Sequence, residues 1–465
     1  MSVESVDLQG KKVLFVAYFY PPSESTGVPG SMRTLKFIRN LTNGERYVLT
    51  TPPQVAGARD ALSHITLPVN GESVNRVGSW DLFRFLLAVR RSLLKILGKK
   101  QRSVAQSGPE IGDSVFKNAT DDPTELPGRM QRFKDFVYNL CYFPDQAGPW
   151  IIPAFLAGRR LVKQRKLDVV FATGSPWSGL IVGYLISRAT GKPLIADFRD
   201  PWMNNPFHQS KGKLLDRWSA RLEQAVVRHA AAVSLNTPPL LDEFLKRYPT
   251  LDKTKFFVLP NGFDPAEFDH VIPEARPDQG RSLLLCHAGF LYGVRDPEVL
   301  LEAIRKANRR LAASEKRVVF RQIGDVQLSY DIQDRYADLI EDHSLIIDAP
   351  RPYKECLSVL ASADAVVNIQ PATQSQIPSK LYDYLGINRP IINITSRDGA
   401  LGRLVTERDI GSLVEFDEVD TLTDILVREA ETKSTPSFSG YASREDFNIH
   451  RISAILAQKI VQLSP

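Results

Sequence analysis

The chain has 465 residues, of which 43% are hydrophobic, so it is long enough for two domains with sizeable cores and excludes a small, single-module protein. Lysine and arginine number 59 against 53 acidic residues, and the formal net charge of +6 favours phosphate-bearing or anionic partners. The cysteines Cys141, Cys286 and Cys356 are too few and too far apart for a disulfide framework, which indicates a reducing compartment.

Targeting signals are not visible in the sequence. Residues Met1–Lys12 are polar and lack the apolar core of a signal peptide, and no uninterrupted apolar run is long enough to cross a bilayer. We therefore expect a cytoplasmic protein.

In the first half of the chain, short apolar runs alternate with helix-like stretches, a pattern typical of a parallel α/β sheet. The expected strands are Val13–Phe19, Tyr47–Leu49, Val169–Ala172, Leu194–Phe198, Ala231–Leu235 and Phe256–Leu259. The expected helices are Met32–Leu41, Ser178–Ala189, Lys213–His229 and Pro239–Arg247.

Two other segments of this half have unusual compositions. Leu82–Arg102 mixes large apolar residues with many cations and contains no acid, which predicts a basic amphipathic helix that lies on an anionic membrane surface. The alternative is an ordinary packed helix with a solvated basic face. Residues 99–129 are rich in Ser, Gly, Pro and Asp, which predicts a surface insertion.

A second series of apolar runs follows in the other half. The expected strands are Leu283–Cys286, Val318–Ile323, Leu345–Ile347, Ala365–Ile369, Ile391–Ile394 and Ser412–Phe416. Between the two series, residues 261–281 contain several prolines and no hydrophobic periodicity, as expected of a linker. The sequence thus predicts Rossmann-like domains at 1–260 and 282–437, followed by a closing helix within 438–465.

Glycines follow the first strand of the first half. Gly27 and Gly30 stand just before the helix expected from Met32, where backbone N–H groups can approach a phosphate. The spacing is neither Gly-x-Gly-x-x-Gly nor a P-loop, so dinucleotide oxidoreductases and nucleoside triphosphatases lose support. A loop that merely needs positive φ is the alternative.

The first strand of the second half is followed by a similar pattern. Gly289 and Gly293 would let the backbone approach a diphosphate, and Arg295 offers a planar counter-charge. Taken alone, Arg295 would be read as a surface salt-bridge partner of Asp296 or Glu298. A second cation on a neighbouring strand end favours the phosphate reading.

That second cation lies in Gln376–Pro390, which follows the strand-like run Ala365–Ile369. A polar turn with Ser379 opens a helix that carries Lys380 and Asp383 in its first turns, suited to an anion and to a sugar hydroxyl. Parallel sheets bind ligands where a strand's carboxyl end meets the next helix.

The third cluster follows the strand Leu194–Phe198. Asp197 or Asp200 would orient or deprotonate an acceptor hydroxyl, and Arg199 would touch a phosphate. An internal Asp–Arg pair that fixes the loop is the alternative. The histidines and cysteines form no zinc motif, no Asp-x-Asp or Gly-x-Ser-x-Gly occurs, and no nucleic-acid recognition motif is present.

Four motifs together resemble the retaining glycosyltransferases of family 4, of the kind that acts on bacterial surface polysaccharides. They are Val13–Pro22 with Gly27, Ala196–Trp202, Leu259–Asp264 and Pro378–Leu385. The resemblance covers nearly the whole chain and implies the GT-B fold, an α/β architecture of two Rossmann-like domains facing a central cleft.

The family also implies roles for individual residues. The donor would bind the C-terminal half and the acceptor the N-terminal half, with retention of anomeric configuration and without metal. Where relatives often have two glutamates, this chain has Ser375 and Asp383, and the second position binds the donor ribose. Arg295 and Lys380 would supply the family's basic pair, and Arg199 stands where many members have a histidine.

The sequence therefore predicts a glycosyltransferase that moves a sugar from a nucleoside-diphosphate sugar, its co-substrate, to a glycan or lipid-linked acceptor, with no cofactor. Its donor site would comprise Gly27, Gly30, Gly289, Arg295, Ser379, Lys380 and Asp383. Asp197, Arg199 and Asp200 would serve catalysis at the acceptor. Two alternatives stay open: a nucleotide-sugar epimerase of the same fold, and a non-catalytic partner subunit. Nucleic acid is not expected as a partner.

Overall fold

The computed structural model describes residues 7–22, 30–53, 65–81, 83, 129–205, 210–276, 280–432 and 438–464. The chain divides into two compact units, Met1–Leu259 with Ser453–Pro465, and Pro260–Ile452. It passes from one unit to the other after Leu259 and again within the last helix, α15 (Ile449–Leu463).

The first unit is built on a seven-stranded parallel sheet in the order β3-β2-β1-β4-β5-β6-β7. The strands are β1 (Lys12–Val16), β2 (Glu45–Thr50), β3 (Ser73–Arg76), β4 (Val169–Gly174), β5 (Leu194–Phe198), β6 (Ala232–Leu235) and β7 (Phe256–Val258). All residues of β4, β5 and β6 are buried, which explains why the central strands read as continuous apolar runs.

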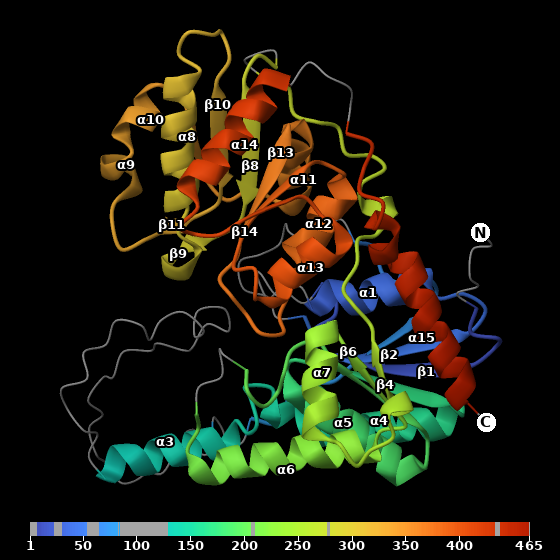
Figure 1. The fold of residues 1–465 in the computed structure, drawn as a ribbon. Helices are drawn as coiled ribbons and strands as arrows, with labels where there is room; N and C mark the ends of the chain where they lie inside the picture. Colours follow the sequence, from blue (N-terminus) through green and yellow to red (C-terminus); the bar gives the residue numbers. More distant parts are fainter. Residues whose placement is uncertain are drawn as a thin grey trace, which may run out of the picture. The chain divides into compact units, whose positions relative to one another are not determined.

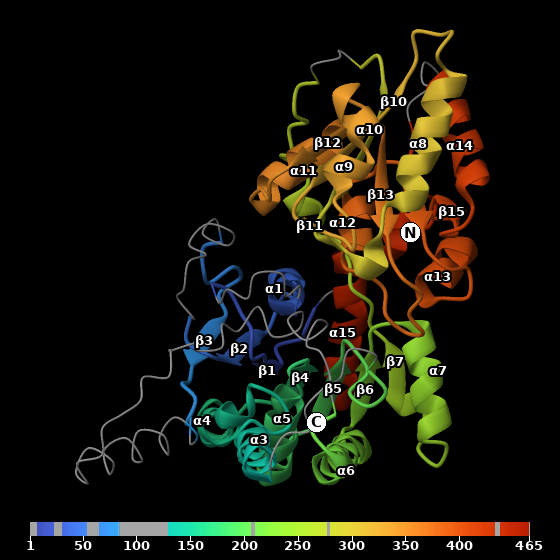
Figure 2. The ribbon, with the colours of Figure 1, turned by 90° about the vertical axis from the view of Figure 1, so that its left-hand side faces the viewer.

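Helices cover both faces of this sheet (Figures 1 and 2). The helices are α1 (Gly30–Asn40), α3 (Arg129–Cys141), α4 (Ile151–Arg165), α5 (Trp177–Thr190), α6 (Lys213–His229) and α7 (Pro238–Arg247). Alternate residues of β1 serve the two faces: Leu14 and Val16 belong to the core under α4 and α5, whereas Phe15 contacts Phe171 beside α1.

The second unit has a six-stranded parallel sheet in the order β12-β10-β8-β13-β14-β15. The strands are β8 (Leu283–Ala288), β10 (Val318–Ile323), β12 (Leu345–Asp348), β13 (Ala365–Ile369), β14 (Ile391–Ile394) and β15 (Ser412–Val414). A short ribbon pairs β9 (Leu291–Tyr292) with β11 (Val326–Gln327).

Two cores lie on the two faces of this sheet. The helices are α8 (Glu298–Arg310), α9 (Ile332–Arg335), α10 (Ala337–Glu341), α11 (Tyr353–Ser362), α12 (Lys380–Ile387), α13 (Ala400–Arg408) and α14 (Val419–Thr432). Leu285 of β8 joins the core under α8 and α14, and its neighbours Leu284 and Cys286 join the core under α11, α12 and α13 (Figure 1). The strand therefore alternates between two buried faces.

Both sheets change strand order at their centre. In the first sheet the chain runs outward from β1 through β2 to β3 and then returns to place β4 on the other side of β1. In the second sheet it runs from β8 through β10 to β12 and then places β13 on the other side of β8. This is the Rossmann strand order, and the break between β8 and β13 is a topological switch point, where open α/β sheets bind ligands. The predicted α/β fold class with two Rossmann-like domains is confirmed.

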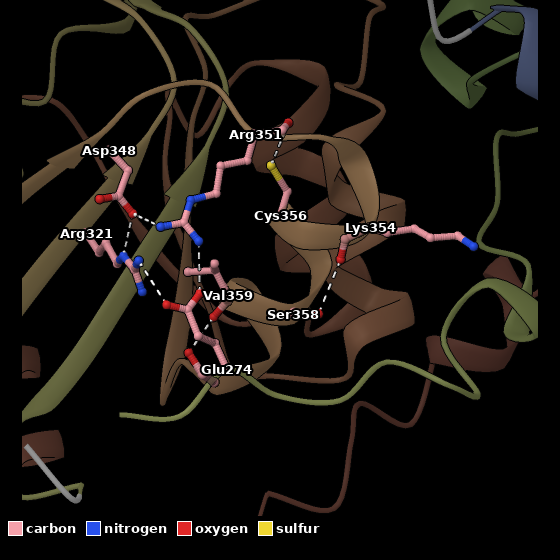
Figure 3. A network of polar contacts seen from close by, with 9 residues as sticks. Glu274, Arg321, Asp348, Arg351, Lys354, Cys356, Ser358 and Val359 are labelled. Carbon is pink, nitrogen blue, oxygen red and sulfur yellow. Dashed lines mark hydrogen bonds and ion pairs between the residues drawn. The ribbon is translucent and has the colours of Figure 1, made fainter. Parts of the chain in front are cut away.

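The segment predicted as a linker, residues 261–281, is attached to the second unit. The Glu274 carboxylate lies 3.2 Å from an Arg321 guanidinium nitrogen and 3.0 Å from one of Arg351. Both arginines also pair with Asp348, at 2.7 and 3.1 Å (Figure 3). Because two cations and two anions alternate around this ring, the charge of Glu274 is neutralised within the second unit.

Other expectations differ from the structure or fall outside it. The closing helix is preceded by a 3₁₀ turn, Arg444–Phe447, so α15 occupies only the later part of the predicted range 438–465. Two predictions fall outside the described residues. They are the amphipathic segment Leu82–Arg102, apart from Phe83, and the surface insertion at 99–129, apart from its last residue. Within the described part of the chain, no helix combines the length and apolar character that crossing a bilayer requires.

Candidate functional site

The loop after β13 brings a group of predicted donor-site residues to the start of α12. The helix begins at Lys380, directly after Ser379, and carries Asp383 in its first turn. It ends at Ile387, and the next residue, Asn388, has a φ of 59°, in the left-handed region that asparagine tolerates at a helix end. Because β13 and β8 are neighbours, α12 starts near the carboxyl end of β8.

Lys380 contacts a buried polar chain that crosses the sheet. Its Nζ atom lies 2.9 Å from Nε2 of His287, a fully buried residue of β8. The other ring nitrogen of His287, Nδ1, lies 2.7 Å from Oε1 of Gln322 on β10. His287 and Gln322 are partners in the parallel register of these strands, so the sheet itself fixes their separation.

Gly289 lies beside the lysine ammonium. A Cβ atom at this position would stand 2.5 Å from Lys380 Nζ, and the glycine has a φ of +130°. The Gly289 carbonyl accepts a hydrogen bond of 2.7 Å from Gln322 Nε2. The backbone therefore turns closely around the ammonium, a close approach that glycine permits because it has no side chain.

Arg295 approaches the same region from the loop after β9. It ends a 3₁₀ turn, and its Nη2 donates to Oε1 of the buried Gln370, just after β13, at 3.0 Å. Its guanidinium carbon lies 5.3 Å from the centre of the Tyr292 ring. Its Nε atom is buried and has no hydrogen-bond partner in the described part of the chain.

The alternative role for Arg295, a surface salt bridge, is not observed. Asp296 instead accepts hydrogen bonds from the Glu298 backbone and from the Tyr330 hydroxyl. Glu298 pairs with Arg335. Both acids that stand near Arg295 in the sequence are thus engaged elsewhere.

Lys380 and Arg295 are two cations that have no acidic ion-pair partner among the described residues. Desolvation and, second, the charge of Arg295 lower the pKa of Lys380 to about 7, and Asp383 partly opposes this shift. Burial, and then the charge of Lys380, lower the pKa of His287 well below its usual range. No carboxylate forms an ion pair with either cation among the residues that the structure describes, so the site favours an anion from outside.

Asp383 is hydrogen-bonded to a residue of the neighbouring helix. The Tyr353 hydroxyl, at the start of α11, donates to Asp383 Oδ1 at 3.0 Å. Burial and the nearby Asp383 charge raise the pKa of Tyr353 well above its usual value. The hydroxyl therefore stays protonated and orients the carboxylate.

A surface hollow of about 590 Å³ lies at the ends of β10 and β12. It is lined by residues of segments 324–333 and 347–350. Its first residue, Gly324, offers its carbonyl to Gln322 Nε2 at 3.3 Å, so the hollow borders the polar chain that ends at Lys380. The size suits part of a small-molecule ligand.

In the first unit, Asp197 is part of a buried network. Its side chain is 0% exposed, and it forms a two-pronged ion pair with Arg33 at 3.0 and 3.3 Å. Thr173 and Ser234 donate hydroxyl hydrogen bonds to its two oxygens at 2.7 and 2.8 Å. This is the internal Asp–Arg pair of the alternative reading, with Arg33 as the arginine, and it favours a positioning role for Asp197.

The other predicted residues of the first unit are placed differently. Arg199 is half-buried, and its guanidinium donates to the carbonyls of Gly174 and Ser175 at the end of β4. Asp200 is also half-buried, and Gly30 is the first residue of α1. Gly27 lies outside the described residues, so its role in the donor site stays a prediction.

Four residues around Lys380 were missed by sequence reasoning: His287, Gln322, Gln370 and Tyr353. His287 lies in β8, Gln322 in β10 and Gln370 directly after β13, three strands that the sequence predicted. Tyr353 begins α11, which directly precedes β13 in the chain. The usable signal was a polar residue inside an otherwise apolar strand, as with His287 and Gln322, because a buried polar side chain needs a partner.

The fold defines a protein of the GT-B class, which is built from two Rossmann-like domains. The family model of Glycosyltransferase Family 4 matches residues 115–267, less than half of the chain. The predicted resemblance to that family is confirmed. No curated protein sequence gives a significant match.

Solved structures share the fold at low sequence identity. Sucrose-phosphate synthase from Thermosynechococcus elongatus has a TM-score of 0.54 and 15% identity, covering 98% of this chain and 99% of that chain. The apo lipopolysaccharide outer core galactosyltransferase has a TM-score of 0.50 and 12% identity, and the match covers 96% of this chain and 99% of that chain. The E. coli trehalose-6-phosphate structure bound with UDP-2-fluoro glucose has a TM-score of 0.53 and 11% identity. The match covers 97% of this chain and 98% of that chain.

Proposed function

We propose that the protein is a glycosyltransferase that binds a nucleoside-diphosphate sugar in its second unit. The observation that carries this proposal is the pair of Lys380 and Arg295 at the switch point, two cations without a carboxylate partner in the described part of the chain. A diphosphate supplies the missing negative charge. The neighbour that is bound with UDP-2-fluoro glucose supports a nucleotide-sugar ligand.

The two cations also suit the chemistry of transfer. When the bond between the sugar carbon and the diphosphate oxygen breaks, its electrons stay on the departing diphosphate. Fixed cations stabilise that developing charge more effectively than water does. Gly289 and Ser379 would contribute backbone or hydroxyl donors, and Asp383, oriented by Tyr353, would accept from the ribose. Retention of configuration and independence of metal follow from the family resemblance and are part of the proposal.

The acceptor would be a glycan or a lipid-linked sugar, approached from Arg199 and Asp200 in the first unit. A surface of α6, which we call the basic α6 face, supports a lipid-linked acceptor held at an anionic membrane surface. Its members are the exposed residues Lys213, Leu214, Arg217, Trp218 and Arg221.

Two properties of the basic α6 face fit an anionic membrane. Leu214 is 47% exposed and Trp218 39% exposed, so apolar area is available for the interfacial region. None of the three cations pairs with a carboxylate among the described residues, whereas the two acids of α6 are engaged: Asp216 with Ser210, and Glu223 with Arg247. Together with the predicted amphipathic segment Leu82–Arg102, this face would place a cytoplasmic protein peripherally at the inner side of the cell membrane.

A panel of nucleotide sugars, incubated with the purified protein with and without membrane lipid extract, tests the proposal. A glycosylated lipid that forms only with extract supports transfer. An isomerised nucleotide sugar without extract would instead identify an epimerase. Binding without any product would identify a non-catalytic subunit.

A separate measurement tests the donor site. Calorimetric titration with nucleoside diphosphates should show weaker binding for Lys380→Ala and for Arg295→Ala, by about tenfold or more, because each removes a charge-assisted hydrogen bond. Unchanged affinity in both variants would contradict the phosphate assignment.

A further inference from the structure

The hydrogen-bond pattern around His287 fixes which ring nitrogen carries the proton. Gln322 Nε2 faces two carbonyl oxygens, those of Gly289 at 2.7 Å and Gly324 at 3.3 Å. Only the NH₂ group of the amide can donate to both, so Oε1 is the atom that faces His287 Nδ1 at 2.7 Å. An oxygen acceptor at this place requires a proton on Nδ1.

The second ring nitrogen then has only one role left. In a neutral imidazole with hydrogen on Nδ1, Nε2 carries a lone pair and accepts. Its partner at 2.9 Å is Lys380 Nζ, which is a donor in every protonation state and has three hydrogens as an ammonium. One of these hydrogens is therefore directed at the ring, and the other two are left for a ligand.

We propose that His287, held in its Nδ1–H tautomer by Gln322, is a positioning residue that aims the Lys380 ammonium at the diphosphate of the donor. This inference rests on the proposed donor site and adds to it a buried residue that contacts no substrate atom. The device depends on register, because His287 and Gln322 face each other across β8 and β10.

The chain of hydrogen bonds from Gln322 through His287 to Lys380 has one direction, because the backbone carbonyls of Gly289 and Gly324 hold the Gln322 amide in place. The two carbonyls that hold Gln322 belong to the turns at Gly289 and Gly324, which also contact each other: a Cβ on Gly324 would stand 2.9 Å from the Gly289 oxygen. The same turn that would cradle the diphosphate thus orients the amide, the amide orients the imidazole, and the imidazole orients Lys380. Such supporting contacts commonly set the geometry of a charged ligand-binding group.

Paired variants of the full-length protein test the proposal by calorimetric titration with pyrophosphate, UDP and GDP. His287→Phe keeps an aromatic ring, although a larger one, but removes the acceptor, and we expect about tenfold weaker binding or more. His287→Gln can offer an oxygen near the place of Nε2, and we expect it to recover most of the affinity. Thermal unfolding of both variants verifies that the second unit stays folded.

The tautomer is measured independently of any ligand. In protein labelled with ¹⁵N-histidine, the signal that disappears in His287→Gln belongs to His287, and it should show a protonated Nδ1 and an unprotonated Nε2. A proton on Nε2 would overturn the proposal, as would full affinity in a folded His287→Phe protein or equal losses in the Phe and Gln variants. If the wild-type protein binds none of the three probes, the donor site itself is wrong, and the positioning role is overturned with it.

Discussion

Gly289 and Lys380 lie so close that a Cβ atom on the glycine would stand 2.5 Å from the lysine Nζ and 2.9 Å from its Cε. The residue that turns the backbone and the residue that supplies the charge therefore occupy one continuous surface. No side chain larger than hydrogen fits between them while Lys380 keeps its contact with His287.

Substitution of this glycine should disable the donor site. We expect Gly289→Ala to displace the ammonium and to weaken nucleoside-diphosphate binding by about tenfold or more, measured by calorimetry. The control is Gly78→Ala, an exposed glycine of the first unit where a Cβ meets no atom within 4 Å. Equal affinity of the two variants would contradict the arrangement.

Donor binding should take up a proton near neutral pH. Desolvation and the charge of Arg295 lower the pKa of Lys380 to about 7, against the pull of Asp383, and a bound diphosphate would raise it again. The affinity gained from the ammonium is thus complete below the pKa that Lys380 has in the free protein. It is lost as the pH rises through the higher pKa that Lys380 has in the complex.

Titrations in buffers of different ionisation enthalpy, from about pH 6 to about pH 9, measure this uptake. Lys380→Arg is the control, because arginine stays charged over this range and should bind with less proton uptake. If wild type and Lys380→Arg show the same uptake, Lys380 does not titrate on binding.

Loss of the buried pair in the first unit should destabilise the fold. Asp197→Asn would leave the guanidinium of Arg33, itself 3% exposed in its side chain, without its counter-charge. Breaking such a pair costs about 3 to 5 kcal/mol of unfolding free energy, which denaturant titration measures. Asp242→Asn, an exposed position on α7, should change stability by less than about 0.5 kcal/mol. A stable Asp197→Asn protein that lost only activity would instead support a direct role at the acceptor.

The basic α6 face should bind anionic vesicles. Sedimentation with vesicles of phosphatidylglycerol and phosphatidylcholine should show binding that requires the anionic lipid. Arg217→Ala and Arg221→Ala should each reduce it about fivefold, since a cation near such a surface contributes about 1 kcal/mol.

Arg310→Ala is the control for that experiment, because Arg310 is an exposed cation of α8 that pairs with Asp424. Its removal should leave vesicle binding unchanged. Binding that persists in the α6 variants and disappears on deletion of Leu82–Arg102 would assign the membrane contact to that segment alone.

Much of the sheet could be predicted from sequence because its central strands are buried on both faces. Leu194–Phe198, Val318–Ile323, Ala365–Ile369 and Ile391–Ile394 were predicted with the bounds that the structure has. The edge strand Ser73–Arg76 was missed, since its residues are half-buried or exposed and it has no continuous apolar pattern.

The site was harder to predict because its partners are distant in sequence. Lys380 and Arg295 could be found from strand ends, which a parallel sheet brings to one edge. The partner of Asp197 could not, because Arg33 lies 164 residues away and nothing in its local sequence marks it as buried. The contact of His287 with Lys380 likewise depends on the register of β8, β10 and β13, which sequence patterns do not specify.

The described residues that would hold the diphosphate and ribose, Gly289, Arg295, Lys380 and Asp383, all belong to one of the two units. Lys380 and His287 are 93 residues apart in the chain and meet only when β8 pairs with β13. A nucleotide bound there would therefore stabilise the folded state in which these strands are paired. By mass action, a ligand at a hundredfold excess over its Kd adds about 2.7 kcal/mol to the stability of the folded state that binds it. If the units melt separately, the transition that moves with nucleotide concentration identifies the second unit, and the ligand becomes a reporter of which half of the molecule has unfolded.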